Sequence, residues 1–160
     1  MGKHKNSIPD KPQFYGRRKG HALRPHRQLL MAELLPELLV SADGEYALDA
    51  AEIWLEIGFG AGEHLAAQAE SHPAIGLIGC EPYINGVATL LSVIEQKNLT
   101  NIRLFNDDAR LLLAKLKPAT ISRVFVLFSD PWPKKRHNRR RLITPENLTA
   151  LSQIMTDRAE

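Results

Sequence analysis

Four acidic side chains in this 160-residue sequence each stand at or just after the end of a short apolar run: Glu56, Glu81, Asp108 and Asp130. Carboxylates accept hydrogen bonds from hydroxyl and amine groups, and they offset positive charge on a ligand. Their repeated position suggests that they converge on one small-molecule site. The residues around each acid indicate the chemistry of that site.

Glu56 opens the glycine-rich stretch Glu-Ile-Gly-Phe-Gly-Ala-Gly, which contains Gly58, Gly60 and Gly62. Glycines at a strand-to-helix turn permit a tight turn and let a ligand approach the backbone. The dinucleotide pattern GxGxxG fails because its sixth position is Glu63, which would oppose a pyrophosphate. A cationic cofactor without phosphate, such as S-adenosylmethionine, suits Glu56 better. A glycine turn with no ligand is the alternative.

Glu81 follows Gly62 by 19 residues and ends the next apolar run. A carboxylate at this place can accept both ribose hydroxyls of an adenosine cofactor, a need that NAD and S-adenosylmethionine share. The alternative is a solvent-exposed acid at a strand end. Asp108 and Ala109 come next along the chain, and an acid followed by a small residue can meet an adenine ring. Equally, Asp107 or Asp108 can cap a helix that begins at Ala109.

The sequence Phe-Ser-Asp-Pro-Trp-Pro at 128–133 contains the fourth acid, Asp130. Methyltransferases that act on base nitrogens often place an acid or amide, prolines and an aromatic residue here, and Trp132 can stack on a base. Burial of Trp132 in the core is the alternative. Six of the eight residues from Lys134 to Arg141 are Lys or Arg. A basic strip beside this motif predicts contact with phosphates.

Apolar runs that alternate with helical patterns must position these residues. Short apolar runs predict strands at 52–57, 75–80, 101–105 and 122–128, the last one buried on both faces. Helical spacing predicts a helix from Leu29 to Leu39 that Pro36 kinks or splits. Further helices are predicted at 62–71, 84–97 and 109–117, and Thr144-Pro145-Glu146 opens the last one. This alternation predicts an α/β fold with a parallel sheet.

In order and spacing, these motifs resemble those of the bacterial tRNA (guanine-N7-)-methyltransferases. The matching segments are residues 15–20, 24–27, 56–62, 79–81, 106–109 and 128–141. They are spread over nearly the whole chain, and the last segment is the most specific. The resemblance implies a Rossmann-like, class I methyltransferase that uses S-adenosyl-L-methionine. Its product would be 7-methylguanosine, made at N7 of a guanine in the variable loop of tRNA.

The resemblance also implies the roles of individual residues. Those expected to bind the cofactor are Glu56, Gly58, Gly60, Gly62, Glu81, Asp108, Ala109 and Asp130. Asp130 would in addition be the catalytic residue. Those expected to bind the substrate or RNA are Lys134, Arg136, His137, Asn138, Arg139, Arg140 and Arg141. The resemblance implies no metal, and a monomer for the full-length protein.

The family pattern continues beyond Glu160 with further strands and a substrate motif that bears a threonine and an acid. We therefore expect a domain truncated after its fourth strand, which would form an exposed apolar edge in the usual strand order 3-2-1-4-5-7-6. We predict that the 160-residue chain alone is unstable and inactive. A monomeric chain with a cooperative melt and normal turnover would contradict this prediction.

Charge is distributed unevenly along the chain. Residues 1–27 contain eight Lys and Arg and one Asp, a net charge of +7, and residues 134–160 carry +4. The net charge of the whole chain is +3, so residues 28–133 carry −8. Two basic segments around an acidic middle suit a polyanionic partner such as tRNA, although a solvated tail and loop would look the same. We expect a basic arm at 1–27 and one domain at 28–160.

A single cysteine, Cys80, predicts neither a disulfide nor a zinc site. The basic N-terminus lacks a secretory apolar region, Asn6 breaks the myristoylation pattern, and no apolar run is long enough for a membrane span. These features predict a cytoplasmic protein. Three rival functions remain: a nicotinamide-dependent oxidoreductase, a noncatalytic RNA-binding module and a DNA base methyltransferase.

Overall fold

A sheet of four parallel strands forms the centre of the computed structural model, which describes residues 14–41, 43–127, 129 and 132–160. The strands are β1 (Glu52–Ile57), β2 (Ile75–Cys80), β3 (Ile102–Phe105) and β4 (Ile121–Val126), in the order β3-β2-β1-β4. The chain leaves β1 toward β2 and β3, and then returns to place β4 on the other side of β1. Ligands bind at such a reversal, outside the carboxyl ends of the strands.

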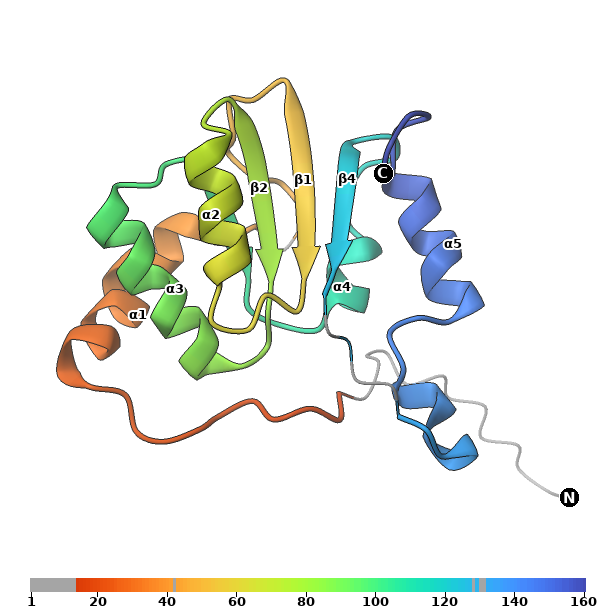
Figure 1. Ribbon diagram of the computed structural model, residues 1–160, viewed down its shortest axis with the longest axis horizontal. Helices are drawn as coiled ribbons and strands as arrows, with labels where there is room; N and C mark the ends of the chain where they lie inside the picture. The colour runs from red at the N-terminus through yellow and green to blue at the C-terminus, as the bar shows by residue number, and fades with distance from the viewer. Residues whose placement is uncertain (1–13, 42, 128, 130–131) are drawn as a thin grey trace, which may run out of the picture.

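Helices cover both faces of the sheet, as the alternating pattern predicts (Figure 1). On one face α1 (Pro25–Leu38), α2 (Glu63–Ser71) and α3 (Ile84–Lys97) enclose a core that includes Trp54 and Leu77. On the other face α4 (Ala109–Leu113) and α5 (Pro145–Ile154) pack over Leu55 and Ile78. A short 3-10 helix, η1 (Lys135–Arg140), lies beyond the carboxyl end of β4 (Figure 1).

Two helix predictions were wrong in detail. α1 begins at Pro25 and continues through Pro36 to Leu38, so Pro36 does not split it. A proline this close to the end of a helix removes only one backbone hydrogen bond, which the last turn tolerates. α4 ends at Leu113 rather than at residue 117, because the N–H groups of Lys115 and Leu116 both donate to the carbonyl of Leu112 and close a turn.

β4 is less buried than predicted: residues 122–126 are half-buried, and Phe128 lies outside the described residues. Its outer edge is nevertheless paired along the first half of the strand. The N–H of Glu160 donates to Ser122 O (3.1 Å), and the N–H of Val124 donates to Glu160 O (2.8 Å). The expectation of an exposed edge is therefore wrong for this half of β4, because residues after α5 return along the strand. The instability and inactivity that were predicted from that edge no longer follow from it.

The segment before α1, residues 14–24, is called the arm segment below. It runs along the lower side of the domain in Figure 1, beneath the carboxyl ends of the strands and toward η1. The N–H of Ile84 donates to Arg18 O (2.9 Å), and the N–H of Gly20 donates to Asn85 Oδ1 (2.8 Å). The arm segment is thus docked on the start of α3, and it is not a solvated tail.

Candidate active site

The glycine loop between β1 and α2 needs glycine at all three predicted positions, since Gly58, Gly60 and Gly62 have φ of 77°, 60° and 87°. This left-handed region is unfavourable for other residues. A Cβ at Gly58 or Gly60 would meet nothing within 4 Å, whereas one at Gly62 would lie 2.7 Å from a methyl carbon of Leu90. The first two glycines therefore border open space, and the third permits close packing.

Glu81 is fixed against this loop. Its Oε2 accepts the N–H of Gly60 (2.9 Å) and its Oε1 accepts the N–H of Tyr83 (2.9 Å), while the residue is only 8% exposed. Each carboxylate oxygen has two acceptor positions, so both oxygens can still accept a ligand hydroxyl. The alternative of a solvent-exposed acid is wrong for Glu81.

Asp108 caps α4, as one of the two interpretations predicted. Its Oδ1 accepts the backbone N–H of Arg110 (3.0 Å), and its carboxylate also accepts from the Arg110 guanidinium. Asp108 and Ala109 border the same cavity as Gly58 and Glu81. Capping therefore does not remove Asp108 from the candidate site.

One cavity brings together several of the residues that the sequence predicts, although Gly60, Gly62, Lys134, Arg136, His137 and Asn138 do not line it. Its lining includes Gly58, Glu81, Asp108, Ala109, Trp132, Arg140 and Arg141. The same cavity contacts the arm segment through Phe14, Tyr15 and Gly16, which the sequence did not single out for the site. Two adjacent aromatic residues within a basic, polar segment were the signal that could have indicated them.

Glu56 does not line this cavity, although it was predicted to bind the cofactor. Its carboxylate points to the α2 side of β1, where Oε2 lies 2.7 Å from Nδ1 of His64, and the residue is 2% exposed. Burial raises the pKa of the Glu56 carboxyl, and the hydrogen bond with His64 partly opposes this rise. His64 also packs edge-on against Phe125 of β4, so it joins β1, α2 and β4.

Gly86 on α3 is a further residue that the sequence did not indicate. A Cβ at this position would lie 2.1 Å from the carbonyl oxygen of Gly60. Gly86 therefore lets the start of α3 approach the glycine loop, and any larger residue would displace one of the two. Nothing in the spacing of the sequence shows this approach, because it joins elements that are far apart in the chain.

Trp132 stands at the edge of the cavity and is half-buried, so the alternative of a fully buried core residue is wrong. It has φ of 40°, an unfavourable conformation for a large residue. Arg141 stabilises this turn, because its Nε and Nη2 donate to Trp132 O at 3.1 and 2.9 Å. The ring of His137 meets the Trp132 ring edge-on, with 5.5 Å between their centroids.

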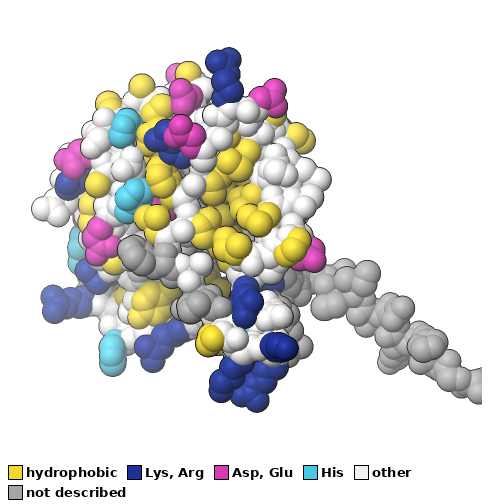
Figure 2. Space-filling view, turned by 45° about the vertical axis from the view of Figure 1, so that its right-hand side comes forward, with side chains coloured by type: hydrophobic (Ala, Val, Ile, Leu, Met, Phe, Trp, Pro, Cys, Tyr) yellow, Lys and Arg dark blue, Asp and Glu magenta, His cyan; other side chains and the backbone are white. Residues whose placement is uncertain are grey.

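The basic residues around η1 divide into two groups. Lys134, Lys135, Arg136 and Asn138 are exposed, whereas His137, Arg140 and Arg141 are half-buried and contact neighbouring residues. Figure 2 shows Lys and Arg gathered toward the lower end of the molecule, with apolar side chains exposed above them. Asp130 and the side chain of Arg139 lie outside the described residues, so their predicted roles stay predictions.

No helix within the described ranges is long and apolar enough to cross a membrane. Cys80 lies against the cavity, with its thiol donating to Asp107 O (3.2 Å). Burial raises the pKa of this thiol well above its usual range, so Cys80 stays protonated. Its place in the site is therefore that of a small apolar wall.

Known proteins resemble this chain in sequence and in fold. A family model described as "Putative methyltransferase" matches residues 50–160. The tRNA (guanine-N(7)-)-methyltransferase of Paramagnetospirillum magneticum is 45% identical over all of this chain and 73% of its own length. The protein of that name from Rhodopseudomonas palustris is 47% identical over 92% of this chain and 62% of its own length. The chain thus spans roughly two thirds of such relatives.

Solved structures share the fold at low sequence identity. An antibiotic-related methyltransferase covers 85% of this chain and 62% of its own, with a TM-score of 0.53 and 15% identity. A SAM-dependent methyltransferase from Thiobacillus denitrificans, solved with S-adenosylhomocysteine, covers 85% and 46%, with a TM-score of 0.51 and 15% identity. These likenesses confirm the predicted Rossmann-like, class I methyltransferase fold. The family model and the sequence relatives show that the chain belongs to the tRNA (guanine-N(7)-)-methyltransferase family.

Proposed function

We propose that this chain binds S-adenosyl-L-methionine in the cavity described above and transfers its methyl group to N7 of a guanine in tRNA, forming 7-methylguanosine. One observation carries the proposal. A single cavity is lined by Gly58 and Glu81 and also by Trp132, Arg140 and Arg141. A cofactor and a nucleic-acid base can therefore meet within it. The curated relatives carry the same activity in their names.

The residues present fit an adenosine-containing, cationic cofactor. Glu81 would accept the ribose hydroxyls, and the space beside Gly58 and Gly60 would admit the ligand close to the backbone. Asp108 and Ala109 would border the adenine. Glu56 would act from behind the loop, as a buried negative charge that favours the positive end of the cofactor.

In this reaction the main task of the protein is to position the guanine N7 against the methyl group of the cofactor. S-adenosylmethionine supplies an activated methyl group when bound. Guanine N7 carries an in-plane lone pair and needs no deprotonation, so the residues must bring it to near-attack distance, about 3 to 3.5 Å. In our proposal Asp130 stabilises the positive charge that develops on the base or orients it through its N–H donors. Lys134 contacts the substrate, and residues 136–141 contact the RNA.

Partner and location follow from the same proposal. The enzyme would act on tRNA in the cytoplasm, with the guanine of the variable loop as its target. The exposed charges of Lys134, Lys135 and Arg136 support a polyanionic partner. The full-length protein is proposed to be a monomer. Neither a metal nor a membrane has a part in this proposal.

Calorimetric titration of the 160-residue chain with S-adenosylhomocysteine, and with NADH as the paired ligand, tests the cofactor class. We expect saturable binding of the first only, and loss of that binding in Glu81→Ala. Glu63→Ala is the matched control, since Glu63 is an exposed acid at the start of α2. Binding of NADH alone would overturn the proposal in favour of an oxidoreductase.

The substrate is tested by methyl transfer to unmodified tRNA and to duplex DNA, followed by nuclease digestion and mass spectrometry. We expect 7-methylguanosine in the tRNA alone. Methylated DNA with unchanged tRNA would identify a DNA base methyltransferase. RNA binding without any S-adenosylhomocysteine binding would identify a noncatalytic RNA-binding module.

A further inference from the structure

We propose that Tyr15 of the arm segment stacks on the target guanine and, together with Trp132, forms an aromatic slot for the base at the cofactor cavity. This inference deepens the proposed function and rests on it. Tyr15 and Trp132 both line the cavity, yet they are 117 positions apart in the chain. The slot therefore exists only because the arm segment docks beneath the sheet.

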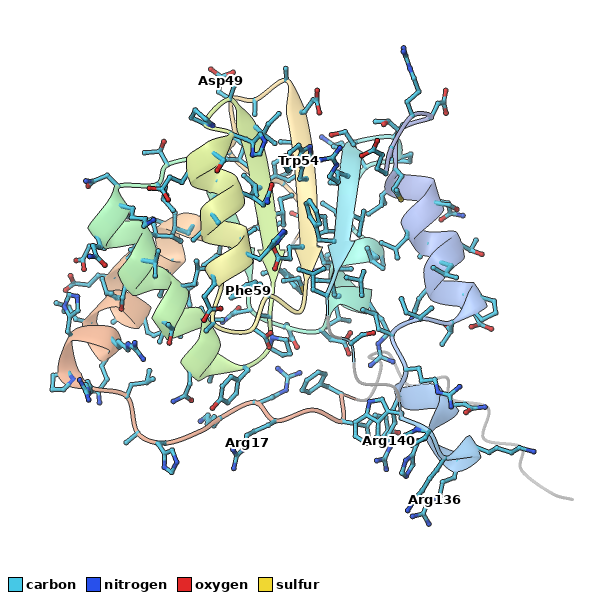
Figure 3. The ribbon with its side chains drawn as sticks, viewed as in Figure 1. Arg17, Asp49, Trp54, Phe59, Arg136 and Arg140 are labelled. Atoms are coloured by element: carbon cyan, nitrogen blue, oxygen red, sulfur yellow. The ribbon has the colours of Figure 1, made fainter. Side chains whose placement is uncertain are left out.

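The side chain of Arg140 contacts both aromatic rings of the proposed slot. Its Cζ atom lies 4.6 Å from the centroid of the Tyr15 ring and 5.0 Å from that of the Trp132 ring, over both rings. Figure 3 shows Arg140 where the arm segment meets η1, whereas Arg136 points away from the domain. A planar cation thus already occupies the ring faces beside the cavity.

Arg140 is held there without a full set of hydrogen bonds. Its Nε is buried, and no residue in the described part of the chain accepts a hydrogen bond from it. A buried donor without an acceptor is unfavourable, and a guanidinium donates readily to oxygen atoms of nucleic acids. The arrangement is therefore suited to exchange: a base takes the place on the rings, and Arg140 turns to an oxygen of the incoming nucleotide.

The chemistry of the product matches this slot. Methylation at N7 makes guanine a planar cation, and the faces of aromatic rings attract planar cations. Aromatic side chains stacked on the base would thus stabilise the positive charge that develops on it during methyl transfer. The Trp132 ring is held for this task by the hydrogen bonds from Arg141 to its carbonyl. Tyr15 is held by the docking of the arm segment on α3.

The test compares the binding of 7-methylguanosine 5′-monophosphate and guanosine 5′-monophosphate to the 160-residue chain, with S-adenosylhomocysteine at saturation. We expect the wild-type chain to prefer the methylated nucleotide. Tyr15→Leu should weaken its binding by about 5- to 150-fold, the range that removal of one base–aromatic stack corresponds to. Tyr15→Phe keeps the ring and should bind like the wild-type chain.

Tyr46→Leu is the matched control, because Tyr46 is half-buried and packs with the α4 and α5 core instead of the cavity. All four proteins should still bind S-adenosylhomocysteine to saturation, which shows that the cavity is intact. Equal nucleotide affinities in the wild-type chain and Tyr15→Leu, or a loss in Tyr15→Phe as large as in Tyr15→Leu, would overturn the slot.

The same titrations separate this inference from the proposed function. A wild-type chain that binds S-adenosylhomocysteine but neither nucleotide overturns the aromatic slot and leaves the cofactor site standing. A wild-type chain that binds neither S-adenosylhomocysteine nor a nucleotide overturns both. A preference for the methylated nucleotide that depends on the ring at position 15 supports the slot.

Discussion

The Arg18 guanidinium lies 2.6 Å from the Asp107 carboxylate and joins the arm segment to the loop after β3. The ion pair is partly exposed, with 47% and 38% of the two side chains accessible. Such pairs contribute at most about 1 kcal/mol and are screened by salt. Because the residues just before Arg18 line the cavity, this contact links the position of the arm segment to cofactor binding.

We therefore expect Arg18→Gln to weaken binding of S-adenosylhomocysteine by up to about fivefold at low salt. The difference from the wild-type chain should shrink as salt rises, and calorimetry at two salt concentrations measures it. Arg17→Gln is the matched control, since Arg17 is exposed and points away from the domain (Figure 3). An equal effect at both salt concentrations would count against an electrostatic tether.

Gly86→Ala should lower both the Tm and the affinity for S-adenosylhomocysteine. In an ordinary helix the same change raises stability by about 1 kcal/mol, but here the new Cβ would clash with the Gly60 carbonyl. Thermal melts measure whether the Tm falls or rises, and calorimetry measures the affinity for S-adenosylhomocysteine. Thr89→Ala, one turn further along α3, serves as the control. If the Gly86→Ala chain is more stable than wild type and binds the ligand normally, then α3 and the glycine loop do not need this close approach.

Glu56 should make stability depend on pH in a defined direction. Its pKa in the folded chain is raised, chiefly by burial. The folded state then binds the proton more tightly than the unfolded state, so the contribution of Glu56 falls as the pH rises through its raised pKa. Glu56→Gln removes this titration. We expect the free energy of unfolding of the variant, relative to wild type, to increase above about pH 4.5.

Urea denaturation of both proteins at several pH values measures that difference. His64→Gln serves as the companion variant, because it replaces the imidazole whose hydrogen bond and charge lower the Glu56 pKa. The pH dependence should be steeper in His64→Gln than in the wild-type chain. A constant difference between wild type and Glu56→Gln across the range would contradict a raised pKa.

The two groups of basic residues should respond differently to neutralisation. Changing exposed Lys135 and Arg136 to Gln should weaken tRNA binding and flatten its salt dependence by about one unit of slope for each phosphate that the protein no longer binds. Arg141→Gln should mainly lower methyl transfer, because Arg141 fixes the Trp132 carbonyl. Filter binding over a salt series and a methyl-transfer assay check the two effects. If the Lys135 and Arg136 changes leave the slope unaltered, η1 does not bind the phosphates.

Asp130→Asn should lower methyl transfer by about 10²- to 10³-fold, the effect of removing one preorganised electrostatic group. Binding of S-adenosylhomocysteine should change little, because the proposed role concerns the base. Single-turnover kinetics and calorimetry separate the two readouts. A variant that mainly loses cofactor binding would assign Asp130 to the cofactor site instead of the reacting base.

Residue periodicity predicted most of the fold correctly, for a local reason. Whether a segment forms a strand or a helix depends on near neighbours, so β1, β2 and α3 have the bounds that their apolar patterns indicate. Errors arose where distant contacts or turn geometry intervene. Examples are the early end of α4 and the pairing of Glu160 with β4. Neither follows from the spacing of apolar residues.

The sequence by itself determined the class of fold, the glycine loop and the strand-end acids, since each depends on residue type at a fixed spacing. It also separated the basic segments from the acidic middle of the chain. Only the tertiary structure decided which of these residues share one cavity. Glu56 lies behind that cavity while the next residue, Ile57, lines it, because successive side chains of a strand point to opposite faces.

The position of the arm segment is the clearest feature that depends on the tertiary structure. Its composition alone fits either a solvated tail or an RNA-binding surface. Hydrogen bonds to Ile84 and Asn85 place it under the strand ends, and this brings Tyr15 beside Arg140 and Trp132. Contacts between residues more than a hundred positions apart depend on how the strands and helices pack together in the whole domain. No local sequence pattern encodes them.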